Sequence, residues 1–467
     1  MELVFRSVGE RTSELALALA IENVKPQRVH VIEDVKPFAL AVRRMLELPH
    51  ATDPKSPCSH VVHMDADCLI LEDMRPFLDD NALPYVDCYV QDRFRGRIHC
   101  GVHVTRADVV RMMATVPVPK DDLPYVLRPE SRLRNLALAE LGLEKQLKSF
   151  HILHDHFQDL ADIFAKYALR ELRSRTEFQR KRLDASMSRW GSGADLDVAR
   201  HAIAHAARVV PPGAKPKHVE AYIQNLPQIA HEELAALGLG DQAPLTRADL
   251  SRAIETDASL HARKPPPKVF CLGLSRTGTR SLTAALHVLG IDTVHYPIDR
   301  GTLEALKRGD GRFPLLDHYD GITDITTIPA FRELDRLHPG AKFILTTRDE
   351  ASWLRSCKQH WGTRPPLEGG MGEEHQVQME VRKHLRQAVY GGYDFDATRF
   401  TLARRDHHAR VTEHFRDRPN DLLTIDIVSG DRWEKLAAFL GLEIPTHPFP
   451  HKGKKLSEKL ASLEIDD

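Results

Sequence analysis

The chain contains 467 residues, of which 42% are hydrophobic and 28% charged, and its formal net charge is −1. This length exceeds what one hydrophobic core usually organises, so two domains are expected. The charges show no basic excess, and we therefore expect no nucleic acid partner. No segment approaches the roughly 18 apolar residues of a membrane helix, and the N-terminus lacks a signal-peptide pattern, which predicts a cytoplasmic protein without a membrane span.

The predicted elements change character twice along the chain. In residues 1–156, short apolar runs such as RVHVIED alternate with helical patterns such as AVRRMLEL, which favours an α/β domain with a largely parallel sheet. Residues 157–262 show helical spacing of apolar positions and predict a helical connector. After the proline-rich linker HARKPPPKV the alternation resumes, so residues 263–467 are predicted to form a second parallel-rich α/β domain.

The segment VFCLGLSRTGTRSLTAALHVLGI, residues 269–291, reads as a buried strand, a loop and an amphipathic helix. Such a loop ends at a helix N-terminus, where unpaired backbone N–H groups and the helix dipole favour an anion. Hydroxyl and guanidinium groups add donors for the same anion. The loop residues predicted to bind it are Ser275, Arg276, Thr277, Gly278, Thr279, Arg280 and Ser281.

The loop keeps the glycine spacing of nucleotide triphosphatases, because Gly273 and Gly278 match it, but Thr279 stands where their lysine is found. Without that lysine the γ-phosphate of ATP would lack its main counter-charge. The loop instead resembles the 5′-phosphosulfate loop of the sulfotransferases. This resemblance implies binding of 3′-phosphoadenosine 5′-phosphosulfate (PAPS).

A second motif, KFILTTRDEASWLRS, is an apolar strand that ends in Arg348 and continues into a helix carrying Ser356. An arginine offers two parallel hydrogen bonds to a phosphate, and a hydroxyl two helical turns later can reach the same group. In the sulfotransferases this arrangement holds the 3′-phosphate of PAPS. The span from residue 268 to about residue 454 resembles a bacterial-type sulfotransferase domain.

The resemblance implies direct sulfuryl transfer, in which Arg276 neutralises charge on the transferring group and a base activates the acceptor hydroxyl. Asp324 is the first candidate for that base, because it precedes the strand leading to Arg348, and His295 is the second. Asp317, His318 and Asp320 in LLDHYDGITDIT remain further candidates.

In the N-terminal region, HVVHMDADCLIL is an apolar strand interrupted by Asp65 and Asp67. Unpaired buried carboxylates are costly, and Mg²⁺ or Mn²⁺ bridging to a diphosphate would offset that cost. The stretch resembles the DxD motif of GT-A-type glycosyltransferases, which implies a nucleotide-sugar donor, and HCGVHVTRADVV resembles a segment near their substrates. A further metal ligand is expected from SFHILHDHFQD, where His154 is preferred over His151 and His156.

The sequence therefore predicts a PAPS-dependent sulfotransferase, acting on a hydroxyl of a glycan or small molecule, fused to a metal-dependent glycosyltransferase. One alternative is a sulfotransferase whose N-terminal half only binds the acceptor. A P-loop nucleotide kinase and a non-enzymatic scaffold are the others. The oligomeric state is not indicated.

Overall fold

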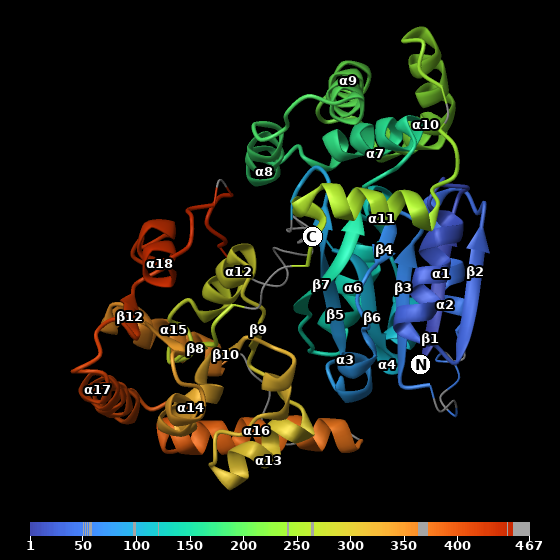
Figure 1. Cartoon of the computed structure of the whole chain (residues 1–467). Coiled ribbons are helices and arrows are strands. Elements are labelled where there is room, and N and C mark those ends of the chain that lie inside the picture. Colours follow the sequence, from blue (N-terminus) through green and yellow to red (C-terminus); the bar gives the residue numbers. More distant parts are fainter. Residues whose placement is uncertain are drawn as a thin grey trace. The chain divides into compact units, whose positions relative to one another are not determined.

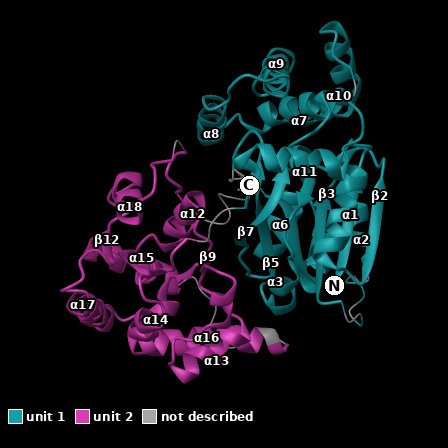
Figure 2. Cartoon of the chain, viewed as in Figure 1, with its two compact units in different colours: residues 1–263, 454–467 teal, residues 264–453 magenta. Residues whose placement is uncertain are grey.

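The computed structural model describes residues 1–451 except 50, 52, 54, 56–57, 97–99, 120, 241, 263–265, 363–371 and 446. The chain divides into two compact units, the first built from residues 1–263 and the second from residues 264–453 (Figures 1 and 2). Within the described part of the chain, no helix has the length and apolar character needed to span a membrane.

The first unit contains a seven-stranded sheet with the order β2-β1-β3-β6-β5-β7-β4. Pairs β1–β2, β1–β3 and β5–β7 are parallel, whereas β3–β6, β5–β6 and β4–β7 are antiparallel. The sheet is therefore mixed rather than largely parallel, because the link from β5 to β6 is too short for a crossover. The strands are β1 (Glu2–Ser7), β2 (Arg28–Glu33), β3 (His60–Asp65), β4 (Cys68–Ile70), β5 (Tyr85–Asp92), β6 (Cys100–Arg106) and β7 (Gln146–His154).

Helices of two groups complete the first unit. Those interspersed with the strands are α1 (Ser13–Val24), α2 (Phe38–Glu47), α3 (Arg75–Asp80), α4 (Ala107–Thr115), α5 (Leu123–Leu127) and α6 (Pro129–Glu140). Those that follow are α7 (Leu160–Arg173), α8 (Glu177–Met187), α9 (Ala194–Val209), α10 (Pro216–Ala236) and α11 (Arg247–Thr256). Phe94 and Leu127 share one core with α7, α9 and α10, so the helical segment predicted as a connector packs as part of the first unit.

In the second unit every strand pairing is parallel among the described residues. Three strands have the order β12-β11-β8, and two more pair as β10-β9. The Val269 N–H at the start of β8 donates to the Asp320 carbonyl, 2.8 Å away, and so joins the two ladders. The strands are β8 (Val269–Cys271), β9 (Thr293–His295), β10 (Gly321–Thr323), β11 (Lys342–Thr346) and β12 (Leu422–Ile425).

Helices cover both faces of this parallel layer, as its alternating apolar residues require. Phe270 and Phe343 belong to the core on one face, and Cys271 and Ile344 to the core on the other. The helices are α12 (Thr279–Leu289), α13 (Arg300–Arg308), α14 (Phe331–Leu337), α15 (Glu350–Gly362), α16 (Glu373–Tyr390), α17 (Ala397–His414) and α18 (Trp433–Leu440), with 3₁₀ turns at Pro314–Asp317 and Ile325–Ala330.

Candidate active site and an acid cluster

The loop between β8 and α12 lies at the carboxyl end of the parallel strands of the second unit. Gly278 immediately precedes α12 with a φ of 99°, a conformation that glycine adopts without strain. Arg276 has a φ of 74°, which is uncommon for a residue with a side chain. Gly273 lies so close to β11 that an added Cβ would be 1.8 Å from Thr346 Oγ1. The loop is therefore held in one specific conformation against its neighbouring strand.

Two loop residues use their polar groups to fix this conformation. The Thr277 hydroxyl, which is buried, donates to the Leu274 carbonyl at 2.6 Å and pairs with Thr346 Oγ1 at 2.6 Å. Ser275 donates its N–H to the Tyr390 hydroxyl at 3.0 Å and accepts at its carbonyl from Trp353 Nε1 at 2.9 Å. These groups face the interior of the unit, so they support the loop rather than present donors to a ligand.

A buried network at the start of α12 connects the two candidates for the catalytic base. Asp324 Oδ2 accepts from Thr279 Oγ1 at 2.8 Å and lies 3.1 Å from His295 Nε2, while Oδ1 accepts from the Ile325 N–H at 2.7 Å. Burial alone would raise the pKa of Asp324, but these hydrogen bonds and His295 lower it to about 2. Asp324 also has a φ of 75°, so its backbone is strained where the network is formed.

The residues predicted to bind the 5′-phosphosulfate and those predicted to bind the 3′-phosphate of PAPS lie together. Arg276 Nε donates to Ser356 Oγ at 3.0 Å, and Arg348 Nη1 donates to the Arg276 carbonyl at 3.2 Å. Arg276 and Arg280 are exposed, Arg348 and Ser356 are half-buried, and Ser281 is buried in the first turn of α12. The structure thus collects two guanidinium groups at a helix N-terminus, a combination that suits a phosphate-rich anion.

Several supporting residues could not be identified from the sequence. Tyr390 and Trp353 hold Ser275, and Arg404 donates to the Arg348 carbonyl at 2.9 Å and to Glu350 at 2.8 Å. These residues come from α15, α16 and α17, far along the chain from the loop. The sequence offers no local signal for them, because an aromatic or basic residue in an amphipathic helix is usually structural.

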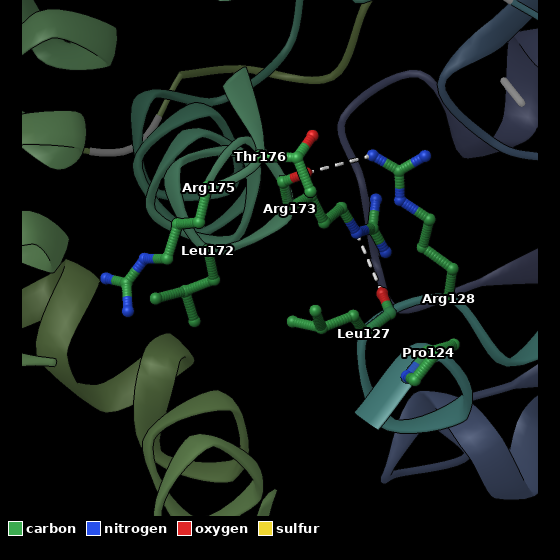
Figure 3. Close-up of a pocket in the computed structure, with 7 residues that line it drawn as sticks. All are labelled: Pro124, Leu127, Arg128, Leu172, Arg173, Arg175 and Thr176. Carbon is green, nitrogen blue, oxygen red and sulfur yellow. Dashed lines mark hydrogen bonds between the residues drawn. The ribbon is translucent and has the colours of Figure 1, made fainter. Parts of the chain in front are cut away.

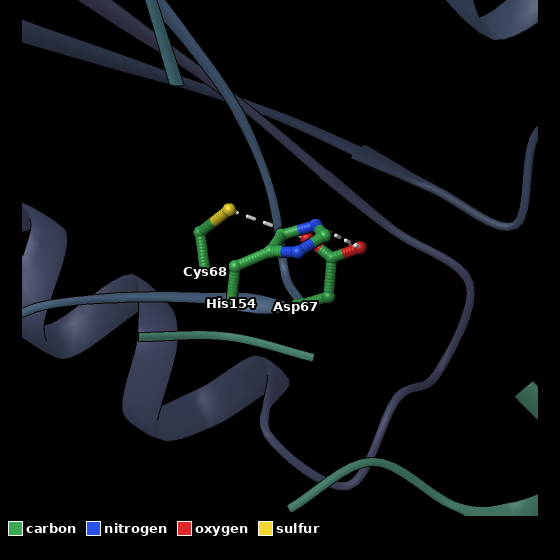
Figure 4. A group of neighbouring side chains, drawn as sticks. All are labelled: Asp67, Cys68 and His154. Carbon is green, nitrogen blue, oxygen red and sulfur yellow. Dashed lines mark hydrogen bonds and ion pairs between the residues drawn. The ribbon is translucent and has the colours of Figure 1, made fainter. Parts of the chain in front are cut away.

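In the first unit, Asp67 and His154 meet where β4 pairs with β7. Cys68 is the register partner of His154, which places His154 Nε2 3.4 Å from Asp67 Oδ2 (Figure 4). The His154 Nδ1 lies 2.7 Å from Asp92 Oδ2. Burial would lower the pKa of His154, but the surrounding carboxylates raise it to about 10. Gly101 at the start of β6 lies against Cys68 and His154, so its backbone forms part of this place.

Asp65, the remaining predicted ligand, is directed to a different partner. Arg6 is its register partner on the parallel strand β1, and Arg6 Nε donates to Asp65 Oδ1 at 2.6 Å. Arg6 also donates to Glu130 Oε2 at 2.8 Å. The group of mutually close ligand atoms that includes Asp67 and His154 has Cys68 as its third member rather than Asp65.

A lysine completes the cluster around Asp67. Lys166 Nζ, from α7, contacts both Asp67 Oδ2 and Asp155 Oδ1. Burial alone would raise the pKa of Asp67, but Lys166 and His154 lower it well below its usual value. An ammonium group and a divalent cation would compete for the same carboxylate lone pairs. The residues present therefore do not fit a metal held by Asp65, Asp67 and His154.

The pocket in Figure 3 belongs to the first unit, where it is formed around α5 and the end of α7. It is lined by Pro124, Leu127, Arg128, Leu172, Arg173, Arg175 and Thr176. Its three arginines donate to backbone carbonyls, as Arg173 does to Leu127 at 2.8 Å, so they connect helices rather than form a ligand site.

Comparison with known proteins agrees with the geometry of the second unit. Residues 268–457 match a family model described as a sulfotransferase domain. The chain is also 28% identical over 210 residues to the Ava biosynthesis cluster protein M of Aspergillus versicolor, an alignment that covers 39% of this chain and 80% of that protein. The family match supports sulfotransfer activity in general.

Proposed function

We propose that the second unit, with its sulfotransferase domain at residues 268–457, transfers a sulfuryl group from PAPS to a hydroxyl of a glycan or small-molecule acceptor. One observation carries this proposal: Arg276, Arg348 and Ser356 gather at the N-terminus of α12. PAPS carries a 5′-phosphosulfate and a 3′-phosphate, so its chemistry suits a site with two guanidinium groups and hydroxyl donors.

The donor would be held by two parts of this site. The backbone N–H groups of the first turn of α12 and the Arg276 side chain would hold the 5′-phosphosulfate, with Arg276 next to the transferring group. Arg348 and Ser356 would hold the 3′-phosphate. Bound there, PAPS supplies an activated sulfuryl group, and the fixed donors of the chain stabilise charge on the departing phosphate.

In this proposal His295 is the base and Asp324 positions it, which reverses the order of preference that the sequence suggests. A carboxylate with a pKa of about 2 is a weak base at neutral pH, so Asp324 serves as a positioning residue. Asp324 accepts from His295 Nε2 and so orients the ring, and His295 would take the proton of the acceptor hydroxyl.

Nucleotide kinase activity is disfavoured by the position that a kinase lysine would occupy. Thr279 stands there, is buried, and donates its hydroxyl to Asp324. No positive charge is therefore supplied by this residue to a γ-phosphate. Binding of ATP as tight as binding of the PAPS product would contradict this reasoning.

The proposal is tested by calorimetric titration of the full chain with 3′-phosphoadenosine 5′-phosphate, the product of PAPS. Arg348→Ala removes charge-assisted hydrogen bonds of about 1.5–3 kcal/mol in all, so affinity should fall roughly 10- to 150-fold. Arg308→Ala, at the end of α13, is the matched control and should bind as the wild type does. If the folded wild type does not bind this nucleotide, the loop holds a different anion and the proposal fails.

Glycosyl transfer by the first unit is a second candidate function. It is favoured by one observation, the meeting of Asp67 and His154 beside the carboxyl end of β3, and it would proceed without a divalent metal held by these two residues. Saturation-transfer NMR with nucleotide sugars, on wild type and Asp67→Asn, tests it. If neither protein binds any nucleotide sugar, the first unit is better explained as the non-catalytic, acceptor-binding domain that the sequence also allows.

A further inference from the structure

We infer that the cation serving the acid cluster of the first unit is the Lys166 side chain, and that no divalent metal binds there. The acid cluster consists of Asp67, Asp92 and Asp155 with His154 between them. This inference concerns the first unit alone and does not depend on sulfotransfer by the second.

The position of Lys166 carries the inference. Its ammonium group contacts one oxygen of Asp67 and one of Asp155, and it is largely buried. A divalent metal bound by Asp67 and His154 would lie close to this ammonium group, because Lys166 Nζ and His154 Nε2 both approach Asp67 Oδ2. Since the two cations would share the Asp67 carboxylate and repel each other, the metal can enter only if Lys166 leaves.

The other acids are also committed to partners within the chain. Asp65 is held by Arg6, and Arg6 is itself fixed by Glu130, so Asp65 cannot turn toward Asp67 without breaking a partly buried ion pair. The carboxylate of Asp92 lies against His154 Nδ1 and accepts from the N–H groups of Phe94 and Arg95. The DxD pair of this chain is thus neutralised by two internal cations, one for each carboxylate.

The fold around Lys166 explains how this lysine reaches the cluster. The chain leaves β7 through Asp155 and Phe157, which have φ values of 60° and 65° and turn it sharply before α7 begins. Lys166 lies on α7, whose apolar residues Ile163 and Tyr167 are buried in the helical core. Packing of this core therefore holds the lysine at the carboxylates without any ligand.

The test is a titration of the full chain with Mn²⁺ alone, followed by the electron paramagnetic resonance signal of free Mn²⁺. Wild type and Asp67→Asn should bind the same amount of Mn²⁺, because the wild-type cluster is expected to hold none. Lys166→Met vacates the cation position and should gain one Mn²⁺ site that wild type lacks, and Asp67→Asn/Lys166→Met should lose this site. Lys166→Arg keeps the charge and should gain nothing.

Lys145→Met is the matched control, because Lys145 is also a largely buried lysine, paired with Asp87 in the same unit at 2.6 Å. It should gain no Mn²⁺ site. The inference is overturned if wild type binds Mn²⁺ at a site that Asp67→Asn removes, or if folded Lys166→Met gains none. If Lys166→Met does not fold, the comparison of wild type with Asp67→Asn still decides the point.

Discussion

Replacing Gly273 by alanine tests whether the loop before α12 depends on its close approach to β11. The new Cβ would lie 1.8 Å from Thr346 Oγ1, although real Cβ atoms essentially never approach another atom within 3.0 Å. Loop and strand must therefore separate by more than 1 Å, or Thr346 must rotate and lose its 2.6 Å hydrogen bond to Thr277. Overpacking of this kind costs about 1–3 kcal/mol of unfolding free energy.

The double variant gives the sharper expectation. Thr346→Ala alone removes one hydrogen bond and should cost about 0.5–1.5 kcal/mol. In Gly273→Ala/Thr346→Ala the clashing oxygen is absent, and the nearest remaining atoms are 3.0 Å from the new Cβ. The double variant should therefore lose about 1 kcal/mol less unfolding free energy than the two single variants lose together. Part of the overpacking remains, because 3.0 Å is still a tight contact.

Denaturant unfolding followed by tryptophan fluorescence measures these values. Of the four tryptophans, Trp190 alone lies in the first unit, so a Trp190→Phe background reports on the second. Gly362→Ala is the matched control, since nothing lies within 4 Å of its added Cβ. The reasoning is refuted if Gly273→Ala changes the unfolding free energy by less than about 0.5 kcal/mol, or if the two substitutions are additive.

Three further predictions concern the same site. The folded pKa of Asp324 is about 2, below its ordinary 3.8, so its ionisation stabilises the second unit above pH 4 by on the order of 2 kcal/mol, and this contribution is lost as pH falls toward 2. Asp324→Asn should flatten that part of the curve of unfolding free energy against pH, and an unchanged slope would contradict the assignment. Tyr390→Phe removes the acceptor of the Ser275 N–H, so unfolding measurements should show a loss of about 0.5–1.5 kcal/mol, and no loss would mean that the loop does not need this support. In sulfotransfer assays at one pH, His295→Gln should lower kcat by at least about 100-fold, whereas a loss below about tenfold would assign His295 a positioning role.

The parts of the fold that follow from local sequence were predictable. The apolar runs alternate with helical patterns, and the loop at residues 273–278 is framed by a strand and a helix, so its position before α12 could be inferred without long-range contacts. Arg348 also follows from a local pattern, a strand leading into a helix. What brings it to Arg276 is the parallel pairing of β8 with β11, the pairing expected of a parallel sheet.

The parts that depend on distant pairing were not predictable. Ser275 is clamped by Trp353 and Tyr390, which are 78 and 115 residues away in the sequence. The mixed sheet of the first unit depends on a short connection between β5 and β6, which a survey of apolar runs does not detect. Likewise, the packing of α7 with Phe94 and Leu127 joins the helical segment to the first unit, whereas its composition suggested a separate connector.

The two acids of the DxD pair show most clearly where the sequence stops being informative. In a continuous strand, Asp65 and Asp67 would point to the same face, and shared metal ligation would follow. However, β3 ends at Asp65, and the turn at residues 66–67 redirects the chain into β4. Asp65 therefore stays beside its register partner Arg6, while Asp67 is delivered to His154 by the pairing of β4 with β7.

That divergence decides what the acid pair can do. An arginine and a lysine reach the two carboxylates from β1 and α7, so each negative charge is compensated separately within the chain. A DxD motif requires a metal only when its carboxylates converge and no internal cation reaches them first. The spacing of two acids in a sequence thus indicates where charge accumulates, whereas the neighbouring strands and helices determine which cation neutralises it.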